Sequence, residues 1–209
     1  MDGLSHNPRI GIFGGSFNPI HMGHLILAQD ALELFELNKV IFVPCACPPH
    51  KPAKDLAPAD HRLAMVEAAL EGDLRMEVSD IELQRGGVSY SVDTAREIKR
   101  LNPESEVVFV IGSDSLPELH QWKDIGQLLD LCRFVALARP GTDLNALKTC
   151  DLRLGDVRSQ ELRERIRVGH CVSISSTDIR YRVAEGMGIR YLVHPAVEMY
   201  IVEHSLYRR

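Results

Sequence analysis

Short apolar segments alternate along the chain with segments of helical periodicity, and this alternation constrains the fold more than any other feature. We expect buried strands at residues 10–13, 40–43, 76–78, 107–111, 134–137 and 191–193. The amphipathic segments predict helices at residues 23–35, 59–70, 91–101, 125–131, 159–167, 177–185 and 196–204. Such alternation is typical of an α/β protein. The sequence therefore predicts a doubly wound, mostly parallel sheet with helices on both faces.

The length, composition and charge of the chain limit its organisation and its ligands. With 209 residues and 45% apolar content, the chain can bury one substantial core, and it contains no repeat or long linker. We expect a single domain over residues 1–209, with a flexible N-terminus at residues 1–8. The formal net charge of -5 weighs against a broad contact with nucleic acid or an anionic membrane, but it is compatible with a small anion held by local positive groups.

The sequence predicts neither a membrane segment nor a secretory signal. No window is apolar over the length that a bilayer requires, and residues 1–8 have neither a basic start nor an apolar core. The cysteines are odd in number and irregularly spaced, which favours reduced thiols over a disulfide framework. We therefore expect a cytoplasmic protein, and a homo-oligomer is compatible with these features.

A glycine-rich run follows the first predicted strand and leads into the first predicted helix. Residues 14–24 read Gly-Gly-Ser-Phe-Asn-Pro-Ile-His-Met-Gly-His. Gly14 and Gly15 allow a sharp turn and a close approach to a ligand, while the N–H groups and positive dipole end of the helix attract phosphate oxygens. His21 and His24 lie three residues apart and share one face of the first helical turn. The pattern predicts a nucleoside triphosphate site.

The spacing excludes two common nucleotide-binding motifs. A dinucleotide-binding loop has the pattern Gly-x-Gly-x-x-Gly after the first strand, whereas the glycines here stand at positions 11, 14 and 15. A P-loop carries Gly-Lys-Ser or Gly-Lys-Thr at the helix start, where this chain has Gly23-His24. We therefore expect histidine, rather than a loop lysine, to contact the phosphates.

Two motifs resemble the signatures of a known superfamily, the nucleotidyltransferases related to class I aminoacyl-tRNA synthetases. Residues 14–24 resemble the first signature, and residues 175–180 (Ser-Ser-Thr-Asp-Ile-Arg) resemble the second ATP motif. Further features resemble the bacterial nicotinate-nucleotide adenylyltransferases: residues 48–51 (Pro-Pro-His-Lys), 89–94 (Ser-Tyr-Ser-Val-Asp-Thr) and 112–114 (Gly-Ser-Asp), and the single tryptophan, Trp122. The resemblance runs from about residue 9 to residue 207, thins only around residues 141–158, and implies a Rossmann-like fold.

This resemblance implies the reaction of nicotinate mononucleotide with ATP, which gives nicotinate adenine dinucleotide and pyrophosphate on the way to NAD. The attacking phosphate is already anionic, so the reaction requires no serine or cysteine nucleophile and no strong base. It requires donors and cations that stabilise charge on the α-phosphate and on the departing pyrophosphate. The implied cofactor is Mg²⁺ carried by ATP, and no other metal or tightly bound cofactor is expected.

The resemblance also implies roles for residues at both ends of the chain. His21, His24 and Arg180 would be catalytic, because they would donate to phosphate oxygens. The residues implied in ATP binding are Gly14, Gly15, Ser16, Phe17, Gly112, Asp114, Ser176 and Thr177. Either Ser176 or Thr177 would cap the following helix and leave its N–H groups for the β- and γ-phosphates. Asp114 would accept a hydrogen bond from a ribose hydroxyl.

The residues implied in binding the mononucleotide are His50, Lys51, Tyr90, Ser91 and Trp122. Lys51 lies in a proline-rich loop over residues 44–58 and would reach the phosphate. The helix predicted at residues 91–101 begins just after Tyr90, so its N–H groups and the Ser91 hydroxyl would receive the nicotinate carboxylate. The pyridine ring would stack on Trp122.

These assignments have structural alternatives. His21 and His24 could be two ligands of a zinc site, although the following helix offers no third. Residues 175–177 could be a helix cap alone, and Asp114 could start a turn. Trp122 could belong to the core, although its polar neighbours favour exposure.

Other functions are alternatives as well. A phosphopantetheine-type adenylyltransferase shares the first motif but lacks the Pro-Pro-His-Lys segment and the context of Trp122. A non-catalytic nucleotide sensor could use the same fold, because a fold alone does not fix a function. An RNA-binding fragment of a synthetase-like protein would need a basic surface. The spacing Cys45-x-Cys47-x-x-His50 suggests a metal site only superficially, because it is tight, contains two prolines and lacks a fourth ligand.

Overall fold

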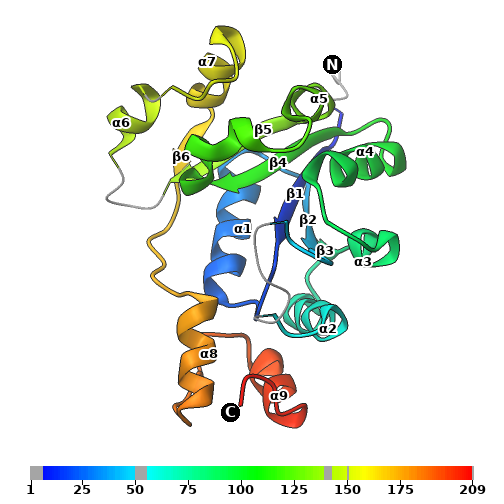
Figure 1. Ribbon diagram of the computed structural model, residues 1–209, viewed down its shortest axis with the longest axis vertical. Helices are drawn as coiled ribbons and strands as arrows, with labels where there is room; N and C mark the ends of the chain where they lie inside the picture. Colours follow the sequence, from blue (N-terminus) through cyan, green and yellow to red (C-terminus); the bar gives the residue numbers. More distant parts are fainter. Residues whose placement is uncertain (1–6, 50–55, 139–142, 150, 209) are drawn as a thin grey trace, which may run out of the picture.

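The computed structural model describes residues 7–49, 56–138, 143–149 and 151–208. Within these residues, six strands form one sheet in the order β3-β2-β1-β4-β5-β6 (Figure 1). The strands are β1 (Arg9–Gly15), β2 (Lys39–Pro44), β3 (Met76–Val78), β4 (Glu106–Gly112), β5 (Arg133–Ala138) and β6 (Ile166–Val168). Every neighbouring pair is parallel. The predicted α/β, Rossmann-like class is therefore confirmed.

Helices connect the strands, and α8 and α9 come after the last strand along the chain. The α-helices are α1 (Met22–Leu34), α2 (Ala59–Leu70), α3 (Ile81–Arg85), α4 (Ser91–Leu101), α5 (Ile125–Leu131), α6 (Leu144–Thr149), α7 (Asp156–Glu164), α8 (Ser176–Ala184) and α9 (Pro195–Glu203). A 3₁₀ helix, η2 (Ser113–Gln121), follows β4. Residues 1–6 of the predicted flexible N-terminus and residues 50–55 of the predicted loop lie outside the described residues.

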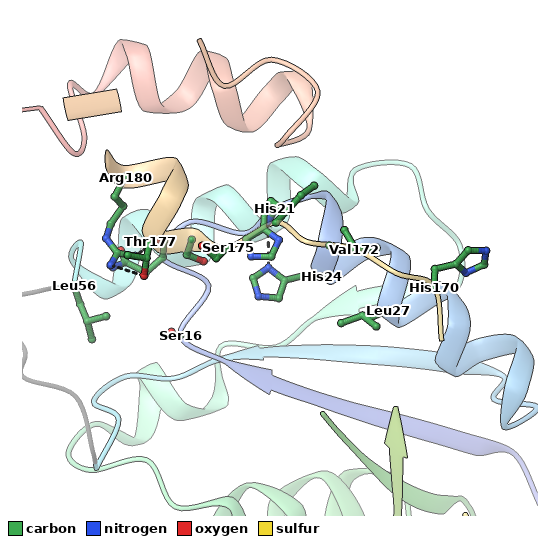
Figure 2. Close-up of a pocket in the computed structure, with 14 residues that line it drawn as sticks. Ser16, His21, His24, Leu27, Leu56, His170, Val172, Ser175, Thr177 and Arg180 are labelled. Carbon is green, nitrogen blue, oxygen red and sulfur yellow. Dashed lines mark hydrogen bonds between the residues drawn. The ribbon is translucent and has the colours of Figure 1, made fainter. Parts of the chain in front are cut away.

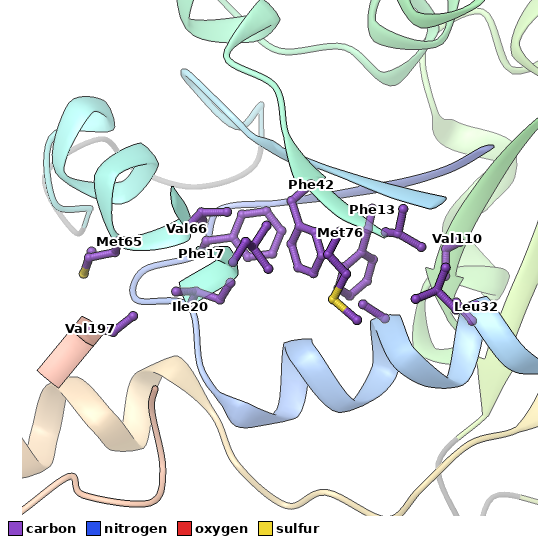
Figure 3. Packing of buried hydrophobic residues seen from close by; sticks show 14 of the residues in the cluster. Phe13, Phe17, Ile20, Leu32, Phe42, Met65, Val66, Met76, Val110 and Val197 are labelled. Atoms are coloured by element: carbon purple, nitrogen blue, oxygen red, sulfur yellow. The ribbon is translucent and has the colours of Figure 1, made fainter. Parts of the chain in front are cut away.

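Alternate residues of the strands enter two separate cores, one on each face of the sheet. In β4, Val108 and Val110 face the first core, whereas Phe109 and Ile111 face the second. Residues of α1, α2, α8 and α9 complete the first core, and residues of α4, η2, α5 and α7 complete the second. Figure 3 shows the first core, in which Phe17 from the loop after β1 lies among these apolar side chains. Both faces of the sheet are thus covered, as parallel sheets require.

The strand order creates a crevice at the carboxyl ends of β1 and β4. Within the sheet, β2 and β3 lie on one side of β1, and the chain later returns to place β4 on the other side of β1. The connection after β1 leads to α1 on the first face, and the connection after β4 leads to η2 on the second face. Connections that diverge in this way leave room for a ligand between the two strand ends.

Two predicted elements are wrong, and both lie in the C-terminal third. The helix predicted at residues 159–167 ends at Glu164, and Ile166–Val168 instead forms β6, which pairs with β5. Residues 191–193 form no strand of the sheet; Tyr191 has a positive φ of 69° and a largely exposed side chain. Ile166–Val168 is a strand because it pairs with β5, and a local apolar pattern does not report such long-range pairing.

Gly11, in the middle of β1, lies where the core leaves no room for a larger side chain. A Cβ atom there would lie 2.8 Å from Leu37 Cδ1 and 3.1 Å from Val40 Cγ2, inside the core. Gly11→Ala should therefore lower the free energy of unfolding by about 1–3 kcal/mol in urea titrations, as overpacked cores do. Gly188→Ala is the matched control, because no atom lies within 4 Å of its added Cβ. Equal stability of the two variants would contradict the packing described for β1.

Candidate active site

The loop after β1 turns at Phe17 and not at the glycines. Gly14 and Gly15 are extended residues that still pair with β2, so the sharp turn predicted at these glycines is wrong. The positive φ of 42° belongs to Phe17, and the peptide bond between Asn18 and Pro19 is cis. Phe17 is only 1% exposed, and its ring packs against those of Phe13 and Phe42. The core therefore anchors the loop, while Gly14 and Gly15 leave the strand end without bulky side chains.

The two histidines of the first motif stack at the start of α1. Their ring centroids lie 3.7 Å apart, and the backbone N–H of His21 donates to Nδ1 of His24 at 3.2 Å. Because Nδ1 of His24 accepts this hydrogen bond, the neutral ring carries its proton on Nε2. Phe17 contacts the His24 ring edge-on at 5.1 Å. His24 therefore presents a donor from a ring whose orientation is fixed on two sides.

Gly23 makes room for this histidine pair. A Cβ atom at Gly23 would lie 3.0 Å from Nδ1 of His21 and 3.3 Å from Cγ1 of Val172. Gly23 belongs to the first motif, but the motif alone predicts no role for it. Its role is steric, because the ring of His21 lies directly over the first turn of α1.

The second motif forms the start of α8, and its cap differs from the expectation. Ser175 is the N-cap, and its Oγ accepts from the N–H of Asp178 at 3.1 Å, so the predicted cap at Ser176 or Thr177 is wrong. The hydroxyl of Ser176 instead donates to the carbonyl oxygen of Pro19 at 2.9 Å. Thr177 Oγ1 accepts from Nη2 of Arg180 at 3.3 Å. The second motif is therefore bound to the loop of the first.

Asn18 joins this arrangement to the C-terminal end of the chain. Its carbonyl oxygen accepts from Nη1 of Arg180 at 2.8 Å, and its Oδ1 accepts from the hydroxyl of Tyr207 at 2.9 Å. Burial raises the pKa of the Tyr207 phenol, whereas Arg180 and Arg62 act in the opposite direction. The hydroxyl therefore stays protonated and remains a donor. Asn18 is 2% exposed; it belongs to the first motif, but the motif alone predicted no role for it.

The two motifs line one cavity of about 410 Å³, which we call the histidine cavity. In Figure 2, His21 and His24 lie in its middle, Arg180 and Thr177 lie at one end, and His170 lies at the other. His170 is anchored to α1, because its N–H donates to Asp30 Oδ2 at 2.6 Å and its Nδ1 lies 2.5 Å from Asp30 Oδ1. The cavity thus gathers imidazole and guanidinium donors from segments far apart in the sequence, which suits an anionic ligand.

A second cavity of about 270 Å³, the tryptophan cavity, lies between the carboxyl ends of β1 and β4. Gly14, Gly112, Ser91 and Trp122 line it, and Ser16 lines both cavities. The two cavities are therefore neighbours. An elongated ligand could occupy both at once.

Trp122 packs against the second core and also lines this cavity. Its ring meets those of Phe109 and Phe134 edge-on, with centroids 5.9 and 6.2 Å away. The side chain is half-buried and keeps part of its surface on the cavity. Its orientation is therefore fixed by the core. Ser91, the first residue of α4 as predicted, lines the same cavity.

Comparisons with known proteins agree with this geometry. A family model described as cytidylyltransferase-like matches residues 12–182, a span that includes both motifs. A protein of Moorella thermoacetica named as a probable nicotinate-nucleotide adenylyltransferase is 44% identical and aligns over 100% of this chain and 95% of its own. A protein of Opitutus terrae with the same name is 44% identical over 96% of this chain and 98% of its own. The chain belongs to the nicotinate-nucleotide adenylyltransferase family.

A solved structure supports the fold of this family member. The nicotinic acid mononucleotide adenylyltransferase of Plasmodium falciparum, complexed with NaAD, superposes with a TM-score of 0.73 and covers 96% of this chain and 97% of its own. The sequence identity is 21%, so the likeness concerns the arrangement of the strands and helices. It matches the single parallel sheet seen here.

Most of the residues that the sequence pointed to meet at the two cavities of this adenylyltransferase family member. The histidine cavity collects Ser16, His21, His24, Ser176, Thr177 and Arg180. The tryptophan cavity collects Gly14, Gly15, Ser16, Ser91, Gly112 and Trp122. Phe17, Tyr90 and Asp114 line neither cavity in the described part of the chain. His50 and Lys51 lie outside the described residues.

Asp114 lies beside the tryptophan cavity at the start of η2. A Cβ atom at Gly112 would clash with Oδ1 of Asp114, so the glycine allows this carboxylate to fold back over the end of β4. The side chain is exposed. Tyr90 occupies the N-cap position of α4, with the ammonium of Lys123 4.1 Å from the centre of its ring.

Sequence reasoning missed a buried carboxylate in the tryptophan cavity. Glu82 is 7% exposed, lines this cavity and accepts a hydrogen bond from the hydroxyl of Thr94. No apolar periodicity or motif marked Glu82 in the sequence.

The described residues include neither a side-chain cluster arranged for a metal ion nor a membrane-spanning helix. No group of three His, Cys, Asp or Glu side chains there is arranged to hold a metal ion. His50, which completes the Cys45-x-Cys47-x-x-His50 spacing, lies outside them. Across the same residues, every helix is too short or too polar to cross a bilayer.

The corrected cap of α8 gives a stability prediction. Ser175→Ala removes the hydroxyl that accepts from the N–H of Asp178 and should lower the free energy of unfolding by about 1 kcal/mol in urea titrations. Thr177→Ala is the control, because its exposed hydroxyl bonds to Arg180 and caps no backbone group. A larger loss in Thr177→Ala than in Ser175→Ala would contradict this cap.

Proposed function

We propose that the protein transfers the adenylyl group of ATP to nicotinate mononucleotide, which yields nicotinate adenine dinucleotide and pyrophosphate in NAD biosynthesis. The observation that carries this proposal is the meeting of the two motifs on one donor-lined cavity, beside a second cavity that contains Trp122. Ser16 lies between the two. A triphosphate in the first cavity and a pyridine nucleotide in the second would bring their phosphates together near Ser16.

In the proposed reaction, an oxygen of the 5′-phosphate of the mononucleotide attacks the α-phosphorus of ATP. A new bond forms between this oxygen and the α-phosphorus. In line with it, the bond between the α-phosphorus and the oxygen that bridges to the β-phosphate breaks, and the electron pair of the broken bond leaves with pyrophosphate. No side chain has to form a covalent bond. The protein therefore has to orient two anions and stabilise the charge that moves onto the leaving group.

The donors of the histidine cavity suit that task. Nε2 of His24 carries its proton because Nδ1 accepts from the backbone, so it is a donor toward an α-phosphate oxygen. His21 lies stacked on His24 and would support the same phosphate. Arg180 is held at one end of the cavity by Asn18 and Thr177, and its guanidinium would face the β- and γ-phosphates.

A divalent cation, which we propose to be Mg²⁺, would enter with ATP and neutralise charge on its phosphates. The described residues contain no group of three acidic, histidine or cysteine side chains arranged around a metal ion, and we assign the cation no protein ligands. The roles proposed for His21, His24 and Arg180 do not depend on the position of the cation.

We further propose that the tryptophan cavity receives the nicotinate ring. The ring would stack on Trp122, whose orientation is fixed by Phe109 and Phe134. The carboxylate would bind at the N-terminus of α4, near Ser91. His50 and Lys51 would contact the phosphate of the mononucleotide, and Asp114 would bind a ribose hydroxyl of ATP.

The alternative functions are less well supported. The relatives that align with nearly the whole chain at 44% identity carry the nicotinate-nucleotide name, which does not favour a phosphopantetheine-type enzyme. The presence of His21, His24 and Arg180 together on one cavity favours an enzyme over a nucleotide sensor, and turnover decides between them. A single domain, a cytoplasmic location, action without nucleic acid and a homo-oligomeric state remain proposals from the sequence.

The first experiment measures pyrophosphate release with ATP and Mg²⁺. Nicotinate mononucleotide, nicotinamide mononucleotide and phosphopantetheine are compared as acceptors. Turnover mainly with nicotinate mononucleotide is expected. Equal use of nicotinamide mononucleotide would contradict the carboxylate site at α4. Pyrophosphate release with phosphopantetheine alone would indicate a phosphopantetheine-type adenylyltransferase. No release with any acceptor would favour the sensor.

His24→Ala tests the donor role of the histidine cavity. Loss of a preorganised donor to a developing charge should lower kcat about 100-fold or more in the pyrophosphate assay, while the chain stays folded by circular dichroism. His204→Ala, in an exposed histidine after α9, should keep wild-type kcat. An unfolded His24→Ala variant would instead indicate a structural histidine.

Trp122→Ala tests the stacking of the ring. Loss of one aromatic stacking partner should raise the KM for nicotinate mononucleotide roughly tenfold, in line with about 1–3 kcal/mol per stacked base. The KM for ATP should change much less. Trp122→Phe should restore most of the affinity for the mononucleotide. An equal rise of both KM values in Trp122→Ala would exclude the assigned stacking.

A further inference from the structure

The guanidinium of Arg62 is buried in the middle of the protein. Arg62 lies on the inner face of α2, at helical spacing from the core residues Met65 and Val66, and it is 1% exposed. A buried cation is costly unless its donors are satisfied. Such a residue at a core position therefore has a specific set of acceptors.

The acceptors of Arg62 lie in three separate segments. Its Nε donates to the carbonyl oxygen of Ala57 at 3.0 Å, its Nη1 to that of Ser16 at 2.8 Å and its Nη2 to that of Ala46 at 3.2 Å. The sulfur of Cys45 lies 3.8 Å from Nη1. None of the ion pairs among the described residues involves Arg62. One planar group thus connects the loops that follow β1 and β2 with Ala57, two residues before the start of α2.

Hydrogen bonds continue from these segments to the tryptophan cavity. The N–H of Ala46 donates to Oγ of Ser89 at 3.0 Å, and the N–H of Ser89 donates to the carbonyl oxygen of Cys47 at 2.9 Å. Ser89 is buried and stands two residues before Ser91. The segment after β2 therefore connects Arg62 with the start of α4.

The other end of the connection reaches the histidine cavity. Ser16 lines both cavities. Ala57, whose carbonyl oxygen accepts from Arg62, also donates its N–H to Oδ1 of Asn18 at 3.0 Å. The carbonyl oxygen of Asn18 in turn holds Arg180. Arg62 is thus bound through backbone groups to the walls of both cavities, although it lines neither.

We propose that Arg62 is a positioning residue that fixes the two substrate cavities relative to each other, an inference that rests on the proposed function. The attack of one bound phosphate on another depends on the distance and angle between them, and a small misplacement costs more rate than affinity. Arginine suits this role because its planar fork directs several donors at fixed angles, whereas the ammonium of lysine is a compact point donor.

The main test is Arg62→Lys, which keeps the charge and loses the fork. In the pyrophosphate assay, kcat should fall roughly tenfold or more, while the KM values for ATP and for the mononucleotide change less, as expected for misaligned substrates. Val66→Ala, on the same helix and in the same core, is the matched control. It should lower stability and keep wild-type kcat well below its melting temperature. Equal kcat in the two variants would overturn the proposal.

Hydrogen–deuterium exchange supplies a readout that does not depend on turnover. In Arg62→Lys, peptides that contain residues 15–19, 45–49 and 88–91 should exchange faster together, whereas Val66→Ala should leave their relative protection unchanged. Faster exchange in α2 alone would overturn the proposal. If the wild-type chain shows no turnover, the proposed function fails, and the exchange pattern still decides whether Arg62 couples these segments.

Ser89→Ala keeps the proposal testable if Arg62→Lys does not fold. It removes the next hydrogen bond of the same connection and leaves Arg62 in place. Faster exchange over residues 15–19 and 45–49 with a reduced kcat is expected. Wild-type exchange over residues 15–19 would show that the connection does not extend to the histidine cavity, and it would overturn the proposal.

Discussion

Hydrogen bonds from α8 to the backbone after β1 hold the halves of the candidate site together. The carbonyl oxygens of Asn18 and Pro19 accept from Arg180 and Ser176, which lie more than 150 residues later in the chain. These bonds are possible because Phe17 is buried in the core and fixes the loop. Together with the packing of Ile179 in the first core, they hold the wall that carries Arg180 beside the loop that leads to the two histidines.

The parallel sheet explains why two cavities lie side by side. The strand order reverses at β1 and β4, so their carboxyl ends are neighbours while their connections lead to opposite faces. The histidine cavity forms beside α1 on one face, and the tryptophan cavity forms near α4 on the other. Ser16 lies where they meet. The proposed reaction, which joins two nucleotides, would fit this arrangement, because each cavity could hold one of them.

Much of the fold could be predicted, and the failures have a common cause. The helices at residues 59–70, 91–101 and 125–131 and the strand at 76–78 have the predicted bounds, because apolar periodicity reports which face is buried. The short strand β6 escaped prediction because it exists through its pairing with β5. The cap at Ser175 was misassigned to Ser176 or Thr177, since neighbouring serine and threonine hydroxyls are equivalent until the backbone is known.

The sequence by itself determined the fold class and the two motifs, because these depend on local periodicity and on short spacings, and the family resemblance pointed to several of the residues that line the two cavities. Only the tertiary structure decided how the motifs meet. It showed that Asn18 joins Arg180 and Tyr207, that Gly23 makes room for His21, and that a core position of α2 holds Arg62. The guanidinium groups of Arg180 and Arg62 bind backbone carbonyls of other segments, and such acceptors carry no signature in the amino-acid sequence.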